Sequence, residues 1–318
     1  MSESQLRVLF VFSGVLGLVI GSFLNVCIFR LPRNCMSIVK PRSRCPKCLT
    51  WIAWYDNLPV ISWTALGGKC RHCKNPISIR YTLVELLTGA LFLWVGWRAL
   101  YGAGQPGVTQ AVRFALEAWF VSAMIVCTFI DLEFRILPDE ITLSGIVIGL
   151  AAAAAFPALY GSELPVLVRE SHGIVPKLIY QLYPNFAIPW TPGNPHLAAL
   201  LASGAGAAAG GGSIWLVGVL GKWMFRKEAM GFGDVKFMAM VGAVLGWRGV
   251  MFTFLIACLW GSLFGIGRLV VMRRMGYVPF GPFLAVGALT MLFVPGLVNA
   301  AIAAYMAFNQ SLIERLLH

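Results

Sequence analysis

A carboxylate at the edge of a long apolar segment is the first feature of this chain that could do chemistry. Asp234 ends the run Gly231-Phe232-Gly233-Asp234, and it is one of four aspartates among 318 residues. An ionisable side chain beside hydrocarbon costs about 2.5 kcal/mol or more, so its presence there indicates a function. Gly231 and Gly233 leave room for a bound peptide backbone to approach the acid. Alone, the pattern fits a helix-capping turn equally well, because Asp is a good N-cap.

A second aspartate stands in a comparable place. Asp131 directly follows an apolar run of spanning length, 111–130, and no capping role is evident for it, whereas Asp139 is expected to cap the next helix. Two carboxylates that meet near a low-dielectric boundary repel, so one keeps its proton near neutral pH while the other ionises. Such a pair supplies a base that activates water and an acid that protonates a peptide bond. The pattern predicts an aspartic protease built on Asp131 and Asp234.

Three other acids are given different interpretations. Asp56 belongs to the turn sequence Asp-Asn-Leu-Pro and is expected to shape or cap that turn. Glu133 and Arg135 are expected to form a solvated pair in a loop. For Glu85, which enters an apolar run just after Arg80, two interpretations stay open: an interfacial pair with Arg80, or a carboxylate that faces a cavity.

The composition places these acids in a membrane protein. Hydrophobic residues make up 58% of the chain, charged residues 12%, and the mean hydropathy is +0.77, which excludes an ordinary soluble domain. Seven apolar runs reach spanning length and an eighth is shorter. They cover 6–29, 83–101, 111–130, 141–159, 197–220, 250–271 and 283–308, with the shorter run at 235–246. We predict an all-α, polytopic membrane protein with about eight transmembrane helices.

The charge distribution predicts the topology. The net charge is +12, and ten of the 25 basic residues lie between Arg30 and Arg80. By the positive-inside rule the basic loops are cytoplasmic, and the loops that hold Asp131 and Asp234 then share that side. The basic excess is thus a topology signal, so lipid and not nucleic acid is the expected surrounding partner.

Four cysteines form a predicted metal site in the one sizeable polar segment. The pairs Cys45/Cys48 and Cys70/Cys73 are two C-x-x-C knuckles with 21 residues between them. Such knuckles are typical of tetrahedral structural zinc. Disulfides, a redox pair and an iron–sulfur cluster remain alternatives, and a reducing cytoplasm disfavours the disulfides. With four protein ligands the metal has no open position, so it should organise the segment and not perform hydrolysis.

The domain organisation follows from these runs. Residues 1–29 are predicted to form the first transmembrane helix, retained in the mature chain. Residues 30–81 are predicted to form a small cytoplasmic zinc-binding domain inserted after it, in which 60–63 suits a short strand. Residues 82–318 are predicted to form the transmembrane peptidase core, with an external loop at about 156–196 that is too polar and proline-broken to span.

The motifs together resemble a known family, the bacterial type IV prepilin peptidases. In chain order they are CPKC, DNLPVISW, GGKCRHC, ISIRYTLVELLTG, IDLEFRILPDEIT, EAMGFGDVK and VPFGPFLAVGA, and the resemblance extends from about residue 14 to 289. By this resemblance, Asp131 and Asp234 match the catalytic aspartates of a GxGD intramembrane-type aspartic protease. The four knuckle cysteines match the zinc tetrad of the family. Thr82 departs from the family pattern, which commonly has proline there.

The resemblance also implies a substrate and a second activity. The family removes a short basic leader from prepilins and prepseudopilins of type IV pilus and type II secretion systems, at the cytoplasmic side of the bacterial inner membrane. It then methylates the new N-terminal amine with S-adenosylmethionine, and Gly68 and Lys69 match its methyltransferase residues. The residues themselves show no glycine-rich strand-to-helix cofactor loop, so this activity rests on the resemblance.

Two rival functions use the same residues differently. In a proton- or cation-coupled transporter, Asp131 and Asp234 would form an ion relay, but this leaves the zinc domain and the shared cytoplasmic side unexplained. A zinc-ribbon scaffold without chemistry explains the cysteines and leaves the aspartates without a role.

Overall fold

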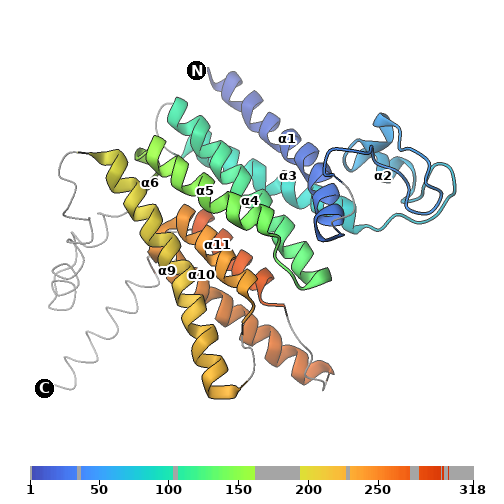
Figure 1. Cartoon of the computed structure of the whole chain (residues 1–318). Helices are drawn as coiled ribbons and strands as arrows, with labels where there is room; N and C mark the ends of the chain where they lie inside the picture. The colour runs from blue at the N-terminus through green and yellow to red at the C-terminus, as the bar shows by residue number, and fades with distance from the viewer. Residues whose placement is uncertain are drawn as a thin grey trace, which may run out of the picture. The chain divides into compact units, whose positions relative to one another are not determined.

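The chain is built almost entirely of helices (Figure 1). The computed structural model describes residues 2–33, 37–102, 107–161, 194–226, 230–272 and 279–294, together with 296 and 300. In these residues the only strand-like pairings are two isolated antiparallel bridges. The chain divides into two compact units, Met1–Pro138 and Asp139–His318, and each is described by itself.

The first unit contains three long apolar helices and a polar segment between the first two. The helices are α1 (Glu3–Arg30), α3 (Arg80–Tyr101) and α4 (Val108–Phe134). A capping box starts α1, because the Ser2 side chain accepts from the Gln5 N–H while the Gln5 side chain accepts from the Ser2 N–H. Helix α4 ends at Arg135, whose φ of 59° is a left-handed cap.

Helices α1 and α3 pack closely because small residues line the face of α1 that meets α3. A Cβ atom added at Gly17 would lie 2.6 Å from Cβ of Phe92 and 2.8 Å from the backbone oxygen of Thr88. A Cβ atom at Gly21 would lie 2.7 Å from Cα of Glu85. Small residues of this kind let helix backbones approach in a membrane, where packing replaces the hydrophobic effect. The opposite face of α1 exposes apolar side chains at helical spacing, namely Val8, Val11, Val15 and Val19.

The polar segment between α1 and α3 contains only short helices. They are η1 (Leu31–Arg33), η2 (Trp54–Asn57) and α2 (Ile61–Ala65). The short strand predicted at 60–63 is therefore wrong. The Ser62 N–H donates to the Leu58 carbonyl and the Thr64 N–H to the Val60 carbonyl, each at 3.1 Å, so the backbone closes a helical turn here.

The second unit is a helical bundle. Its described elements are α5 (Asp139–Ala155), α6 (Ala158–Gly161), α9 (Pro195–Phe225), α10 (Phe232–Met272) and α11 (Gly281–Phe293). Helix α10 is kinked at Gly246, whose φ of 71° and ψ of 175° are not helical. Glycine adopts such a conformation without strain. The kink separates the predicted short run 235–246 from the predicted span 250–271.

Helices α9 and α10 make the closest backbone contacts in this unit. A Cβ atom at Gly206 of α9 would overlap the backbone oxygen of Gly242 of α10, and one at Gly242 would overlap the backbone oxygen of Gly206. A Cβ atom at Gly210 would likewise overlap the backbone oxygen of Met238. The two helices can pack at this distance only because both carry glycine there.

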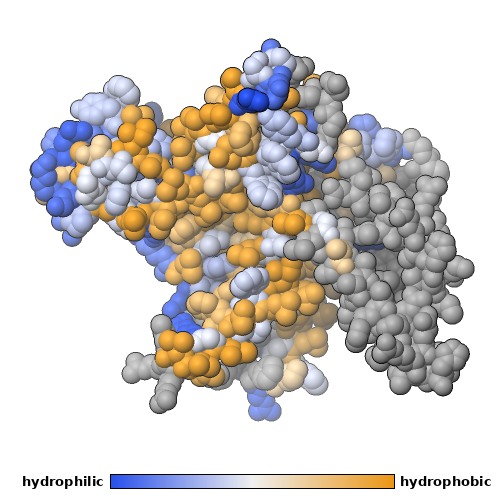
Figure 2. Space-filling model, turned by 180° about the vertical axis from the view of Figure 1, so that it is seen from behind, coloured by the Kyte–Doolittle hydropathy of each residue, from blue (hydrophilic) through white to orange (hydrophobic). Residues whose placement is uncertain are grey.

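The predicted all-α membrane fold is confirmed. The eight apolar runs correspond to α1, α3, α4, α5, α9, the two arms of α10, and α11. In the described part of the chain, five helices are long and apolar enough to cross a membrane, while α5 and α11 are shorter. Figure 2 shows apolar side chains over the helices and hydrophilic ones gathered over the polar segment, at the left of that view. Most of the predicted external loop, and the predicted helix beyond residue 294, lie outside the described residues.

The contact between α9 and α10 leads to a stability prediction. We expect Gly206→Ala to lower the stability of the detergent-solubilised protein by about 1–3 kcal/mol, because the added methyl group forces the helices apart. Gly212→Ala on the same helix is the matched control, since nothing lies within 4 Å of its added Cβ atom. Both changes raise helix propensity equally. Thermal unfolding that gives both variants the same midpoint would contradict this packing role.

Candidate functional site

The four knuckle cysteines lie together in the first unit. All four Sγ atoms lie within 4.8 Å of one another, and those of Cys45 and Cys73 are 3.8 Å apart. Four sulfurs that bind a tetrahedral zinc ion at about 2.3 Å lie roughly 3.8 Å from each other. The predicted set Cys45, Cys48, Cys70 and Cys73 therefore has the spacing that a zinc ion requires.

The two knuckles share one backbone design. In the first, the Cys45 N–H donates to the Thr50 carbonyl at 3.0 Å, and the Leu49 N–H donates to the Cys45 carbonyl at 2.9 Å. The second repeats both bonds at the same offsets, with Cys70 to Asn75 at 2.9 Å and Lys74 to Cys70 at 3.0 Å. Leu49 and Lys74 also share a positive φ, of 59° and 58°. Two copies of one tight loop thus present two sulfurs each to a common centre.

The pKa values of these thiols are those of a group that a bound cation would stabilise in its ionised form. Hydrogen bonds from the Thr50 side chain and backbone lower the pKa of Cys48 to about 6. Backbone hydrogen bonds from Cys73 and His72 lower the pKa of Cys70. Despite a backbone hydrogen bond from Asn75, burial and the other three thiols raise the pKa of Cys73 to about 11. A divalent metal would offset the repulsion between ionised thiols and allow all four cysteines to ionise.

Buried side chains from the membrane helices hold the polar segment in place. The guanidinium of Arg30, at the end of α1, donates to the carbonyls of Ser37 and Pro41, each at 2.7 Å. The Asn25 amide donates to the Tyr81 carbonyl at 3.0 Å and so links α1 to the start of α3. The segment is thus attached where it leaves α1 and where it meets α3.

Within the segment, an ion pair joins the turn before α2 to the second knuckle. Arg71 donates two hydrogen bonds to the carboxylate of Asp56, from Nε at 2.8 Å and from Nη2 at 2.5 Å. These bonds hold the pKa of Asp56 below its usual value. Asp56 shapes the segment through this contact, in keeping with the structural role predicted for it.

Glu85 is a buried acid whose partner is a backbone group. Its side chain accepts a hydrogen bond from the Val60 N–H at 2.8 Å, and Val60 has a φ of 62°, which is strained for a β-branched residue. Arg80, the other partner considered for Glu85, instead binds Glu133. Of the two open interpretations, the structure supports the cavity.

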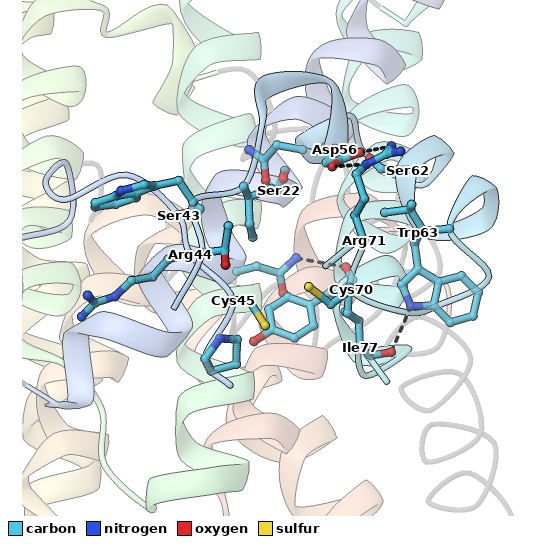
Figure 3. A pocket seen from close by; sticks show the side chains of 18 of the residues that line it. Ser22, Ser43, Arg44, Cys45, Asp56, Ser62, Trp63, Cys70, Arg71 and Ile77 are labelled. Atoms are coloured by element: carbon cyan, nitrogen blue, oxygen red, sulfur yellow. Dashed lines mark hydrogen bonds and ion pairs between the residues drawn. The ribbon is translucent and has the colours of Figure 1, made fainter. Parts of the chain in front are cut away.

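That cavity has a volume of about 640 Å³ and lies wholly within the first unit (Figure 3). Its lining comes from α1, from the start of α3 and from the polar segment, and includes Cys45 and Cys70 of the metal cluster. Figure 3 shows the Asp56–Arg71 pair at one end and Trp63 at the side.

Gly68 and Lys69 occupy the turn beside Trp63. Gly68 has a φ of 67°, and a Cβ atom there would lie 2.9 Å from the Trp63 ring. The Trp63 indole N–H donates to the Ile77 carbonyl at 3.1 Å, while the Ile77 N–H donates to the Gly68 carbonyl at 2.7 Å. Gly68 thereby fixes a wall of the cavity. Lys69 is exposed and pairs through its backbone with Pro76.

Asp131 lies in the last turn of α4, where it is 7% exposed. Two residues later, Glu133 binds Arg33 at 3.4 Å through one oxygen and Arg80 through the other. This single carboxylate joins the end of α4 to η1, which follows α1, and to the start of α3. The predicted pairing of Glu133 with Arg135 is therefore wrong: Arg135 caps α4 in a left-handed conformation, and Glu133 has two nearer cations.

Asp234 stands in the first turn of α10 and is half-buried. Its N–H donates to the Gly231 carbonyl at 3.1 Å, and a Cβ atom at Gly231 would lie 3.7 Å from Asp234 Oδ2. A negative charge in the first turn is stabilised by the helix dipole. The Gly-Phe-Gly-Asp motif therefore lies at the start of a helix, and Asp234 is inside the first turn of that helix.

An ion pair that sequence reasoning missed holds this helix start. Lys236 Nζ lies 2.7 Å from both carboxylate oxygens of Asp139, the first residue of α5. Asp139, predicted to cap this helix, is its first helical residue, and its carboxylate ties the start of α5 to the start of α10. The two residues are 97 positions apart, so no local pattern indicates the contact.

Comparison with known protein sequences shows the family of the chain. The Bacterial Peptidase A24 N-terminal domain matches residues 15–99, and the Type IV leader peptidase family matches residues 172–266. A prepilin leader peptidase/N-methyltransferase of Burkholderia pseudomallei (strain 1026b) is 33% identical over 311 residues, covering 89% of this chain and 84% of that protein. The chain belongs to the type IV leader peptidase family. Asp234 lies inside the second matched range, and Asp131 lies between the two.

Further relatives carry the same printed name, prepilin leader peptidase/N-methyltransferase. One from Myxococcus xanthus is 38% identical over 266 residues, covering 84% of this chain and 65% of that protein. One from Stutzerimonas stutzeri is 33% identical over 300 residues, covering 86% of each. No solved structure matches the chain. The family membership therefore rests on sequence, over most of the chain.

The sulfur cluster leads to a metal prediction. We expect the double replacement Cys45→Ser with Cys70→Ser to remove most of the zinc from the purified protein, because each knuckle then loses a ligand. Elemental analysis by mass spectrometry measures this. Cys258→Ser, which changes an exposed cysteine on α10, should leave the zinc content unchanged. Equal zinc in the double variant and the wild type would show that these sulfurs do not hold the metal.

Proposed function

We propose that this protein is a membrane-embedded aspartic endopeptidase that removes the basic leader from type IV prepilins and prepseudopilins, and that it then N-methylates the new first residue. Its family, and the names of relatives that cover most of its length, support this. Neither the family nor the names of the relatives support a transporter. The catalytic residues of the proposal are Asp131 and Asp234.

The observation that carries the proposal is the ion pair between Asp139 and Lys236. It fixes the start of α10, which bears Asp234, against the start of α5. Only residues 135–138 connect α5 to α4, which bears Asp131 in its last turn. That both aspartates serve one site is part of the proposal, and it is supported by the match of Asp131 and Asp234 to the motifs of the family.

The chemistry needs one ionised and one protonated carboxylate. The ionised one takes a proton from water as the water oxygen attacks the carbonyl carbon of the scissile bond. The protonated one donates its proton to the carbonyl oxygen and regains it as the tetrahedral intermediate collapses. The carboxyl group that took the proton from water gives that proton to the departing amine as the C–N bond breaks. The products are the leader, with a new carboxylate, and the mature chain, with a free amine. Repulsion between the two acids keeps the required proton on one of them.

The remaining groups have supporting roles in this proposal. Cys45, Cys48, Cys70 and Cys73 hold a structural zinc ion, Gly231 and Gly233 give the substrate backbone access, and S-adenosylmethionine supplies the methyl group. Gly68 and Lys69 are assigned to methylation. The concentration of basic residues between α1 and α3 favours a cytoplasmic location of this segment at the inner membrane, where a basic leader would also lie.

The aspartate pair is tested by neutral substitution. We expect Asp131→Asn and Asp234→Asn each to abolish leader removal, because an amide can neither take nor give the required proton. The measurement is the mass of a purified prepilin incubated with the protein in detergent. Glu140→Gln, an exposed acid on α5, is the control that should keep activity. Complete cleavage by either Asn variant, inserted normally, would reject the pair.

The ion pair is tested by exchanging its charges. We expect Lys236→Asp or Asp139→Lys alone to slow leader removal by up to about 100-fold, because the start of α10 would shift relative to α5. The double variant carrying both changes restores the attraction and should recover most of the rate. Initial cleavage rates measure this. A double variant no faster than either single one would argue against a positioning role for the pair.

A further inference from the structure

The lining of the cavity in the first unit combines three kinds of chemical group: a carboxylate, aromatic rings and basic side chains. At one wall stands a buried carboxylate, that of Glu85, which is 8% exposed. Aromatic side chains form other parts of the lining. They are Phe29, Trp51, Trp63 and Tyr81. Exposed basic residues, Arg42, Arg44 and Lys47, complete it.

The carboxylate is held in position for a role beyond its backbone partner. Glu85 Oε2 accepts the Val60 N–H at 2.8 Å, and Ser22 of α1 also hydrogen-bonds to the side chain. A neutral glutamine could accept the same hydrogen bond, so this contact does not require a charge. A buried acid is costly without a cation, and the cations Arg80 and Arg71 are already engaged with Glu133 and Asp56.

The basic residues of the lining are available to a ligand. The side chains of Arg42, Arg44 and Lys47 make no hydrogen bond or ion pair with other residues in the described part of the chain. By contrast, Arg30 and Arg71, which also line the cavity, are engaged with carbonyls and with Asp56. The cavity thus offers a carboxylate for a cation, basic side chains that are unpaired among the described residues for a carboxylate, and aromatic faces for a planar ring.

We propose that this cavity binds the methyl donor, S-adenosylmethionine, and that Glu85 binds its positively charged sulfonium end. The donor carries a planar adenine, a carboxylate, and a sulfonium beside an ammonium group, which match the aromatic, basic and acidic parts of the lining. The volume of about 640 Å³ lies in the range typical of sites for such molecules. This inference rests on the proposed function, which includes N-methylation, and adds where the donor binds.

The same inference explains how Gly68 acts on methylation. The Gly68 backbone is not part of the lining, but the Trp63 ring that it supports is. A side chain at Gly68 would push this ring and alter the cavity wall. Gly68 is therefore a positioning residue for the donor site.

The test measures donor binding directly, without any prepilin. Equilibrium dialysis of the full-length protein in detergent, with radiolabelled S-adenosylmethionine, compares the wild type with Glu85→Gln. We expect the variant to bind at least about tenfold more weakly, because it keeps the hydrogen bond to Val60 and loses the charge. Glu117→Gln is the matched control: this acid is also buried in the first unit, and it does not line the cavity.

A second ligand separates charge recognition from a general structural effect. S-Adenosylhomocysteine has the same shape without the positive sulfonium. The wild type should prefer the charged donor, and Glu85→Gln should lose this preference while its zinc content and leader removal stay at wild-type levels. A general loosening of the fold would weaken both ligands equally.

Several results would overturn the assignment. One is equal donor affinity in Glu85→Gln and the wild type. Another is a wild type that removes the leader but does not bind the donor, which would leave the peptidase proposal intact. A third is a protein that does not bind the donor but is thermally stabilised by anionic lipid vesicles, with the stabilisation lost when Arg42 and Arg44 are changed to Gln. That result would assign the cavity to a lipid headgroup. Donor binding without leader removal would support this site and contradict the peptidase proposal alone.

Discussion

Charged side chains at the ends of membrane helices must find partners, and this constraint organises the structure. A carboxylate in or beside hydrocarbon is expensive unless it is paired or hydrogen-bonded. Glu133 meets the requirement by binding Arg33 and Arg80, and Asp139 meets it by binding Lys236. Each pairing joins helix ends that are distant in sequence. Each ion pair thus helps to hold a helix end near one aspartate of the proposed site.

The metal cluster and the helix ends work together in the first unit. Four sulfurs at the spacing of a zinc site gather two knuckles into one body, and that body is attached to the helices by Arg30 and Glu85. Neither attachment uses a residue of the cluster. A metal bound by the four cysteines would therefore shape the segment, while other side chains set the position of the segment against α1 and α3. The cavity forms where the segment meets these helices.

Much of the fold could be predicted from sequence, because membrane helices and zinc knuckles depend on local patterns. Hydropathy located the helical runs, although it ended α4 at residue 130. The helix continues through Asp131 to Phe134, since the two acids Asp131 and Glu133 do not break it. The partners of Glu133 and Asp139 could not be predicted, because those of Glu133 lie 53 and 100 residues away and that of Asp139 lies 97 residues away. The strand predicted at 60–63 is wrong because the backbone N–H groups of Ser62 and Thr64 bond within one helical turn and not to a second strand.

The glycine contacts between α1 and α3 also affect how the polar segment folds. Because these helices pack backbone to backbone, the two ends of the segment are held at a fixed separation before the knuckles close. For an unattached loop of residues 31–79, bringing the ends together would cost about 3 kcal/mol of loop-closure entropy. The helix pair removes that cost. A segment with little apolar core of its own can consequently fold because both of its ends are tethered. The same sequence without the two helices would bind a metal much more weakly.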